Sequence, residues 1–249
     1  MNREKVIGIL GGMGPEATVE LFRRIVARTP ARRDQDHVRV IIDSNSKIPD
    51  RGSFVFDQRV EDPRPALRET ARNLERAGAD LMVIPCNTVH YYLPEIRRAV
   101  RIPVIDMIHE TTAILNESPV GLLGTDTTTK MGLYHKAALE RGIEILVPAP
   151  EEQRTVMHDI FAIKAGRNDL SIKQELLAVA QRLQEQGAKA MIVGCTEISL
   201  VLSQTDLDIP VYDALDVLAD AALREARTCE TVTVTAPAPR LTLVPSAAA

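Results

Sequence analysis

Two similar stretches of the sequence each lead to a single cysteine. Residues 78–90 read GADLMVIPCNTVH and residues 187–199 read GAKAMIVGCTEIS, so Cys86 and Cys195 each follow a glycine by eight residues. The apolar run before each cysteine predicts a strand, which puts both thiols in a turn between a strand and a helix. Such a turn favours the thiolate, which is a base or a nucleophile. Either cysteine alone is more often a buried core residue, but the matched pair favours shared chemistry.

Short polar residues follow both cysteines. Asn87 and Thr88 come after the first, and Thr196 and Glu197 come after the second. Their side chains and the turn amides can hold the headgroup of an amino acid or another carboxylate. Asparagine and threonine also cap helices, so capping is an alternative explanation that is compatible with binding.

Two cations repeat the same symmetry. Arg51 in IPDRG lies 43 residues after Gly8, and Lys164 in FAIKAG lies 43 residues after Gly121. Each alone would most often be a solvated surface charge. Their equal spacing instead favours a pair that binds a dicarboxylic ligand, for which the arginine fork is well suited.

The elements that must position these residues are predicted by the alternation along the chain. Short runs rich in Val and Ile alternate with longer segments of helical period, which predicts an α/β fold with parallel strands. The motifs also recur in order: GILG at 8–11 matches GLLG at 121–124, and IPVID at 102–106 matches IPVYD at 209–213. We expect two pseudo-symmetric lobes, each a small parallel sheet flanked by helices, with the active site in the cleft between them.

The repeat also sets the expected boundaries. Residues 1–110 form the N-terminal α/β lobe and residues 111–227 the C-terminal one, while a helix at 213–227 is a candidate to cross back to the first lobe. Residues 228–249, rich in Pro, Thr and Ala, are expected to be a loose C-terminal tail.

The segment PEATVELFRRIVAR is expected to form the first helix. Pro15 and Glu16 suit its first turn. Its apolar residues recur with helical spacing, so we expect a single apolar face made of Val19, Phe22, Ile25 and Val26.

The turn GILGGMGPEAT before this helix offers a competing interpretation. Gly12, Gly14 and Ala17 satisfy the dinucleotide fingerprint, and Asp43 could bind the ribose, which would make the protein a nucleotide-dependent oxidoreductase. Pro15 intrudes on the phosphate-binding turn, and this interpretation leaves the second cysteine unexplained. A glycine turn can equally bring backbone amides to a substrate carboxylate.

The composition excludes several other classes of function. The chain has 249 residues, 45% hydrophobic and 26% charged, with a formal net charge of -4. This balance gives no electrostatic reason to bind nucleic acid or anionic lipid, and the N-terminal residues resemble neither a signal peptide nor a membrane span. We therefore expect a cytoplasmic protein that has neither nucleic acid nor a membrane as a partner.

The cysteines and histidines give little support for a metal. The third cysteine, Cys229, makes an odd number without CxxC spacing, which argues against disulfides and a structural zinc site. The five histidines show no ligand spacing, so no metal is expected.

Taken in order, GGMGPEAT, IPDR, PCNTVH, GLLGT, IKAG and GCTE resemble the cofactor-independent aspartate/glutamate racemase family over residues 5–225. The resemblance implies a two-lobed α/β enzyme, commonly a homodimer, that racemises a small acidic amino acid without pyridoxal phosphate or another cofactor. It implies that Cys86 and Cys195 are the catalytic thiols and that Arg51 and Lys164 bind the side-chain carboxylate of the substrate. The remaining implied contacts are pocket-lining Met13 and the holders of the α-carboxylate or amine, Asn87, Thr88, Thr125 and Thr196.

The resemblance favours aspartate over glutamate. Glutamate racemases usually carry Asp-Ser-Gly in the first glycine turn and Thr-His after the second cysteine, where this chain has Gly-Gly-Met-Gly and Thr-Glu. Racemisation needs a base on one face of the α-carbon and an acid on the other, and two facing thiols would supply both. The alternatives are a glutamate or broader amino-acid racemase, and a non-catalytic protein that binds small dicarboxylates.

Overall fold

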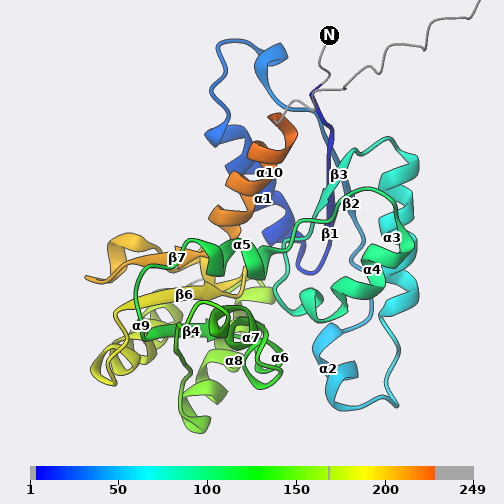
Figure 1. The fold of residues 1–249 in the computed structure, drawn as a ribbon. Coiled ribbons are helices and arrows are strands. Elements are labelled where there is room, and N and C mark those ends of the chain that lie inside the picture. Colours follow the sequence, from blue (N-terminus) through cyan, green and yellow to red (C-terminus); the bar gives the residue numbers. More distant parts are fainter. Residues whose placement is uncertain (1–3, 168, 228–249) are drawn as a thin grey trace, which may run out of the picture.

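The computed structural model describes residues 4–167 and 169–227 and contains two parallel sheets (Figure 1). The sheet of the first lobe has the order β2-β1-β3 and that of the second lobe β5-β4-β6-β7. The two-lobed α/β fold expected from the sequence is confirmed. The strands are β1 (Ile7–Gly11), β2 (Val40–Ser44), β3 (Leu81–Val83), β4 (Val120–Gly124), β5 (Ile145–Leu146), β6 (Ala190–Gly194) and β7 (Val211–Asp213).

The backbone hydrogen bonds repeat between the two halves, as the sequence motifs do. The Met82 amide donates to the Pro103 carbonyl and the Met191 amide to the Pro210 carbonyl, both at 2.8 Å. In the second lobe this pairing extends into β7, whereas in the first it is a single bridge between Met82 and Val104. The first sheet is therefore the same arrangement with its fourth strand reduced to one bridge.

Helices follow most strands, as parallel connections require. Those up to residue 113 are α1 (Pro15–Arg28), η1 (Asp34–Asp36), α2 (Arg51–Phe56), α3 (Arg64–Arg76), η2 (Thr88–Tyr92), α4 (Leu93–Ala99) and α5 (Met107–Ala113). Those that follow are α6 (Asp126–Lys130), α7 (Leu133–Leu139), α8 (Pro150–Lys164), α9 (Leu170–Glu185), η3 (Ile198–Leu200), η4 (Gln204–Asp206) and α10 (Ala214–Arg227).

The helices after the two IPV motifs are exchanged between the lobes. α10 lies beside α1 (Figure 1), and its apolar residues, among them Leu215 and Leu218, share a core with Ile7 and Ile9 of β1. Ile108 of α5 in turn packs into a core with β4 and α7 of the second lobe. Each lobe therefore completes its core with a helix that begins beside the other lobe.

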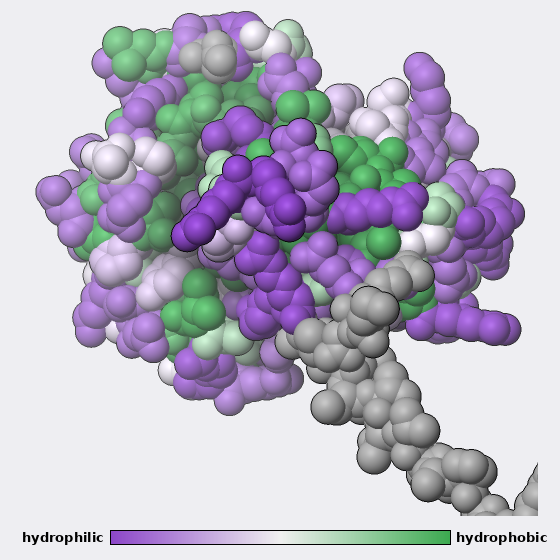
Figure 2. Space-filling view, turned by 90° about the horizontal axis from the view of Figure 1, so that it is seen from above, coloured by the Kyte–Doolittle hydropathy of each residue, from purple (hydrophilic) through white to green (hydrophobic). Residues whose placement is uncertain are grey.

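The apolar face predicted for α1 is largely wrong. Ile25 is buried, but Val19, Phe22 and Val26 are exposed, and the helix instead packs on the core through Ala17, Leu21 and Ile25. Apolar residues likewise reach the surface among hydrophilic ones on the face seen in Figure 2. The spacing identified a helix correctly but not which of its two apolar stripes faces the sheet.

Two further predictions concern the C-terminal tail and the absence of a membrane span. The expected tail at 228–249, with Cys229, lies outside the described residues. Among the residues that are described, no helix combines the length and apolar character needed to cross a membrane.

Candidate active site

Cys86 lies three residues beyond the end of β3, in the turn that leads into η2. Its side chain is buried, with 6% of the residue exposed. The turn is held by His90, which is also buried: the Met107 amide donates to His90 Nε2 at 3.0 Å, so Nδ1 carries the proton and donates to the Cys86 carbonyl at 2.9 Å. His90 thus ties the first cysteine turn to the start of α5.

The His90 position predicts how stability depends on pH. Burial lowers the pKa of His90 below the ordinary value of 6.5. At pH values below 6.5 the unfolded chain therefore binds a proton that the folded chain does not, and stability is lost as the pH falls, by up to about 1.4 kcal/mol per pH unit. We expect urea unfolding at pH 7.5 and pH 5 to reveal this loss, and His90→Gln to reduce it. A His109→Gln control at an exposed position should keep the slope of the parent; equal slopes in the parent and His90→Gln would contradict the prediction.

Cys195 follows β6 directly and is paired with a carboxylate. Its Sγ donates to Oε2 of Glu197 at 3.1 Å, and 3% of Cys195 and 5% of Glu197 are exposed. Burial raises the pKa of the Cys195 thiol, and the charge of Glu197 raises it further. In this arrangement Cys195 is a thiol, ready to donate a proton, with a carboxylate in contact that can accept one.

The two cysteine turns touch each other across the lobe boundary. The Thr196 hydroxyl donates to the carbonyl of Pro85, the residue before Cys86, at 3.3 Å. The hydroxyls of Thr88 and Thr125 lie 2.9 Å apart, one from each lobe. The polar residues predicted to surround the thiols therefore gather at one place between the sheets.

Asn87 also makes a hydrogen bond between the lobes, and its partner is a residue that sequence reasoning missed. The hydroxyl of Tyr134, a fully buried residue of α7, donates to Asn87 Oδ1 at 2.6 Å. This bond orients the amide and leaves its Nδ2 buried without a partner among the described residues. A tyrosine in an unremarkable helical segment carries no motif, so its role follows only from the fold.

Arg51 and Lys164 come from unlike elements in spite of their equal spacing. Arg51 is the first residue of α2 and Lys164 is the last residue of α8. Two cavities, of about 160 and 260 Å³, are each lined by both cations. The first also contains Thr88 and Thr125, and the second contains Met13 and Glu197 among its walls.

The Lys164 ammonium connects the cations to the thiols. Desolvation by itself would lower its pKa, but the charge of Glu197 and the interactions with Cys195 and Cys86 raise it. One ammonium is thus within electrostatic reach of both sulfur atoms. Neither cysteine lines the two cavities, because both are covered by the residues around them.

Asp50 is a second residue that sequence reasoning missed. It precedes Arg51, lines both cavities and accepts the Ser53 amide at 2.7 Å as the N-cap of α2. Burial opposes its ionisation, but the bonds from Ser53 and the charges of Arg51 and Lys164 lower its pKa. Asp50 therefore balances part of the positive charge and fixes the start of the helix that carries Arg51.

The glycine turn does not have the form that a dinucleotide needs. The Gly12 amide donates to the Thr18 hydroxyl at 2.9 Å, so it is not available to a pyrophosphate. Gly12 has φ +91°, and a Cβ there would meet the Asn45 backbone at 2.4 Å, which explains the glycine without a nucleotide. The carbonyl of Met13 accepts from Arg51 Nη2 at 3.2 Å, so the turn serves to hold the cation.

Three buried polar atoms at the site have no hydrogen-bond partner among the described residues: Arg51 Nε, Asn87 Nδ2 and Glu197 Oε1. The first two are donors and the third is an acceptor. An amino acid offers carboxylate oxygens to such donors and an ammonium to such an acceptor. The unused bonding capacity of the site therefore has both polarities that this class of ligand needs.

Comparison with known proteins finds relatives that match most of the chain. The model of the Asp/Glu/Hydantoin racemase family matches residues 10–222. The broad specificity amino-acid racemase RacX of Bacillus subtilis is 28% identical over 229 residues, which cover 88% of this chain and 96% of RacX. The solved structure of Picrophilus torridus aspartate racemase is 30% identical with a TM-score of 0.81, covering 89% of this chain and 94% of its own. An aspartate racemase homologue from Pyrococcus horikoshii is 28% identical with a TM-score of 0.73, covering 89% and 99%.

Proposed function

Because the chain belongs to the Asp/Glu/hydantoin racemase family, a family of isomerases, we propose that it interconverts L- and D-aspartate with Cys86 and Cys195 as its two proton carriers. The observation that carries the proposal is the contact between the two cysteine turns, from Thr196 to Pro85, together with two cavities that Arg51 and Lys164 both line. Aspartate as the substrate is further supported by the likeness to an aspartate racemase structure.

Each thiol serves one face of the α-carbon. One thiolate removes the α-proton while the opposite thiol donates a proton to the other face, and the pair leaves each turnover with its protonation exchanged. Glu197, in contact with Cys195 Sγ, is suited to hold the ammonium or to accept the thiol proton. Which thiol acts on which enantiomer is a prediction from the resemblance only, with Cys86 serving D and Cys195 serving L.

The difficult step is formation of the carbanion at the α-carbon. The site must bind the planar intermediate more tightly than the substrate, which requires donors aimed at its carboxylate in a dry environment. Asn87 Nδ2 is such a donor, and the hydroxyls of Thr88 and Thr125, which contact each other, can turn a proton to the ligand. The hydroxyl of Thr196, which donates to Pro85, would have to leave that carbonyl to join them. Since both sulfur atoms are covered, substrate entry requires the lobes to separate and close again.

Exchange in heavy water tests the proposal. Purified protein incubated with L-aspartate in D₂O, without added cofactor, is expected to produce D-aspartate that carries deuterium at the α-carbon. Chiral chromatography measures the product and proton NMR measures the exchange. Binding of aspartate with neither product nor exchange would overturn the proposal in favour of the dicarboxylate-binding alternative.

The cations predict a preference for acidic substrates. Lys164→Met and Arg51→Met are each expected to lower the ratio of kcat/KM for aspartate to that for alanine by about 10- to 100-fold, because a charged hydrogen bond is lost. Lys130→Met is the matched control, since Lys130 pairs with Asp126 on α6. A loss that is equal for both substrates would show that these cations do not recognise the side-chain carboxylate.

Two alternatives within the family, a glutamate racemase and a broader amino-acid racemase, can be tested by the same kind of assay. Glutamate is longer than aspartate by one methylene, and RacX is a broad specificity racemase. A panel of L-amino acids scored for the opposite enantiomer separates the three cases. The homodimer and the cytoplasmic location stay predictions from the sequence and its resemblance.

A further inference from the structure

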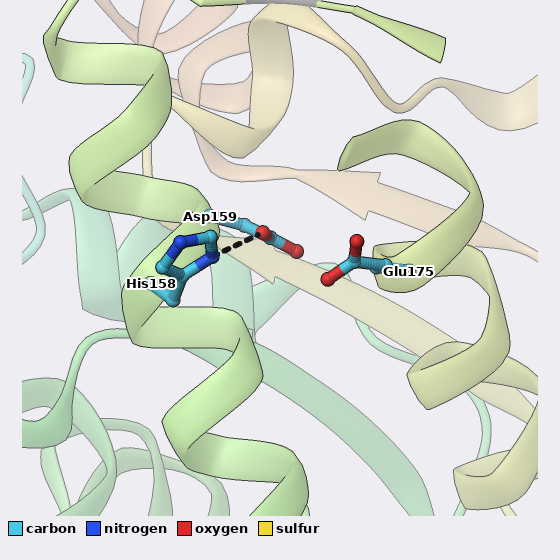
Figure 3. Close-up of side chains that lie close together, drawn as sticks. All are labelled: His158, Asp159 and Glu175. Atoms are coloured by element: carbon cyan, nitrogen blue, oxygen red, sulfur yellow. Dashed lines mark hydrogen bonds and ion pairs between the residues drawn. The ribbon is translucent and has the colours of Figure 1, made fainter. Parts of the chain in front are cut away.

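A second cluster of side chains lies away from the proposed active site, on the facing sides of α8 and α9. It consists of His158 and Asp159 on α8 and Glu175 on α9 (Figure 3). One ligand atom from each lies within 4.8 Å of the others. His158 and Glu175 are exposed, whereas the side chain of Asp159 is 1% exposed.

Asp159 is the unusual member of this cluster. Its Oδ1 is 3.1 Å from His158 Nδ1, while its Oδ2 is buried with no hydrogen-bond partner among the described residues. Figure 3 shows the Asp159 carboxyl pointing toward the carboxyl of Glu175. A buried carboxylate oxygen without a partner, facing a second carboxylate, costs free energy unless a cation or a shared proton lies between them.

The surrounding charges do not supply that cation. Arg167 acts on Asp159 electrostatically, but its guanidinium is paired with Asp169 at 3.0 Å. Burial raises the pKa of Asp159, and the proximity of Glu175 adds to the rise. The cluster thus contains an imidazole and two carboxyl groups without a neutralising side chain in contact.

We propose that His158, Asp159 and Glu175 bind a divalent transition-metal cation of the Zn²⁺ and Co²⁺ class, entering from solvent between α8 and α9. An imidazole nitrogen, carboxylate oxygens and water are all donors that Zn²⁺ accepts. Ligands about 2.0–2.2 Å from a tetrahedral metal lie about 3.4 Å apart. The exposed side chains of His158 and Glu175 would therefore have to close on Asp159 by at most about 1.4 Å from separations within 4.8 Å.

A cation here would act on the proposed active site through α8. The same helix ends in Lys164, and its residues Met157, Ile160 and Phe161 line the cavity that Lys164 lines. A cation shared with α9 would clamp α8 to its neighbour from the opposite side. The role is therefore one of fixing the helix that positions Lys164, with no part in the proton transfer.

Calorimetric titration tests the site without using activity. Because free thiols also bind these metals, the full chain with Cys86, Cys195 and Cys229 replaced by serine is stripped with EDTA and titrated with CoCl₂ or ZnCl₂. One cation per chain is expected, bound at least ten times more weakly by His158→Gln and by Glu175→Gln. Glu185→Gln is the matched control, because Glu185 is exposed on α9, the helix that carries Glu175, and this variant should bind the cation like the parent.

Two further measurements keep the proposal falsifiable. At 100 times the dissociation constant of the parent, the cation should raise the Tm by about 5 °C or more, and at the same cation concentration this rise should fall by about half or more in Glu175→Gln. If the thiol-free chain does not fold, Mn²⁺, which avoids thiolates, is titrated into the unaltered chain by electron paramagnetic resonance. Absence of binding, or binding undiminished in both variants, overturns the site and indicates a proton shared between Asp159 and Glu175. Neither outcome bears on the racemase proposal.

Discussion

Replacing either Cys86 or Cys195 with serine is expected to lower the rate of aspartate racemisation by about 10²- to 10⁴-fold, the usual contribution of a positioned acid or base. A serine hydroxyl has nearly the size of the thiol but does not ionise in the working pH range, so proton transfer at one face of the α-carbon is lost while the fold is kept. Both cysteines are buried and free, so neither substitution removes a disulfide. Initial rates in both directions, followed by chiral chromatography, measure the effect.

The two variants should differ in their partial reactions. If each thiol serves one face, each single variant keeps exchange of the α-proton with solvent for one enantiomer only, and the two variants keep opposite ones. Cys229→Ser, which replaces a cysteine that the proposed mechanism does not use, is the control and should keep full activity. Undiminished racemisation in either active-site variant would refute the two-base mechanism, and retained exchange of the same enantiomer in both would refute the division of faces.

The pairing of the cysteines was predictable because the chain repeats itself. The segments from Gly78 to Cys86 and from Gly187 to Cys195 have the same length, and each contains one of two equivalent strands, β3 and β6. Equal spacing in the sequence therefore corresponds to equivalent positions in the fold, after those strands. The carboxyl ends of parallel strands lie at one edge of their sheet, so the polar residues that follow those strands were expected to lie close together. Thr88, Thr125 and Thr196 do so.

The same reasoning fails where position depends on packing between lobes. Arg51 and Lys164 have equal offsets, yet one begins a helix and the other ends one, because the repeat was not kept in the connecting segments. The exposed stripe of α1 was mistaken for its core face because α10, far along the chain, packs against that helix and decides which side is buried. His158, Asp159 and Glu175 come from two helices, so no local spacing could reveal them.

Removal of Arg24 should strongly destabilise the protein. It is buried on α1 and contacts both halves of the chain: Nε binds Glu20 at 2.7 Å, and Nη1 binds Asp213 at 2.6 Å and Asp216 at 2.9 Å. Its Nη2 also donates to the Ser199 carbonyl at 3.2 Å, in the turn that follows Cys195. The charges of these carboxylates raise the pKa of Arg24 despite its burial, so the guanidinium stays ionised.

Arg24→Met is expected to lower the free energy of unfolding by about 3 kcal/mol, because methionine keeps the apolar packing and leaves Asp213, whose side chain is 12% exposed, as a largely buried charge without its main partner. Urea denaturation measures the loss. Arg23→Ala is the matched control: that side chain lies on the same helix, is 65% exposed and pairs only with Glu20 among the described residues, so it should cost less than about 1 kcal/mol.

A second substitution identifies the origin of the cost. Adding Asp213→Asn to Arg24→Met removes the orphaned charge and should restore part of the lost stability, whereas a cost that came from packing alone would not be restored. Because Ser199 also donates to Asp213 Oδ1 at 2.7 Å, the same network fixes the turn of Cys195. The folded fraction of Arg24→Met should therefore racemise aspartate more slowly than that of Arg23→Ala, and equal specific activities would confine the role of Arg24 to stability.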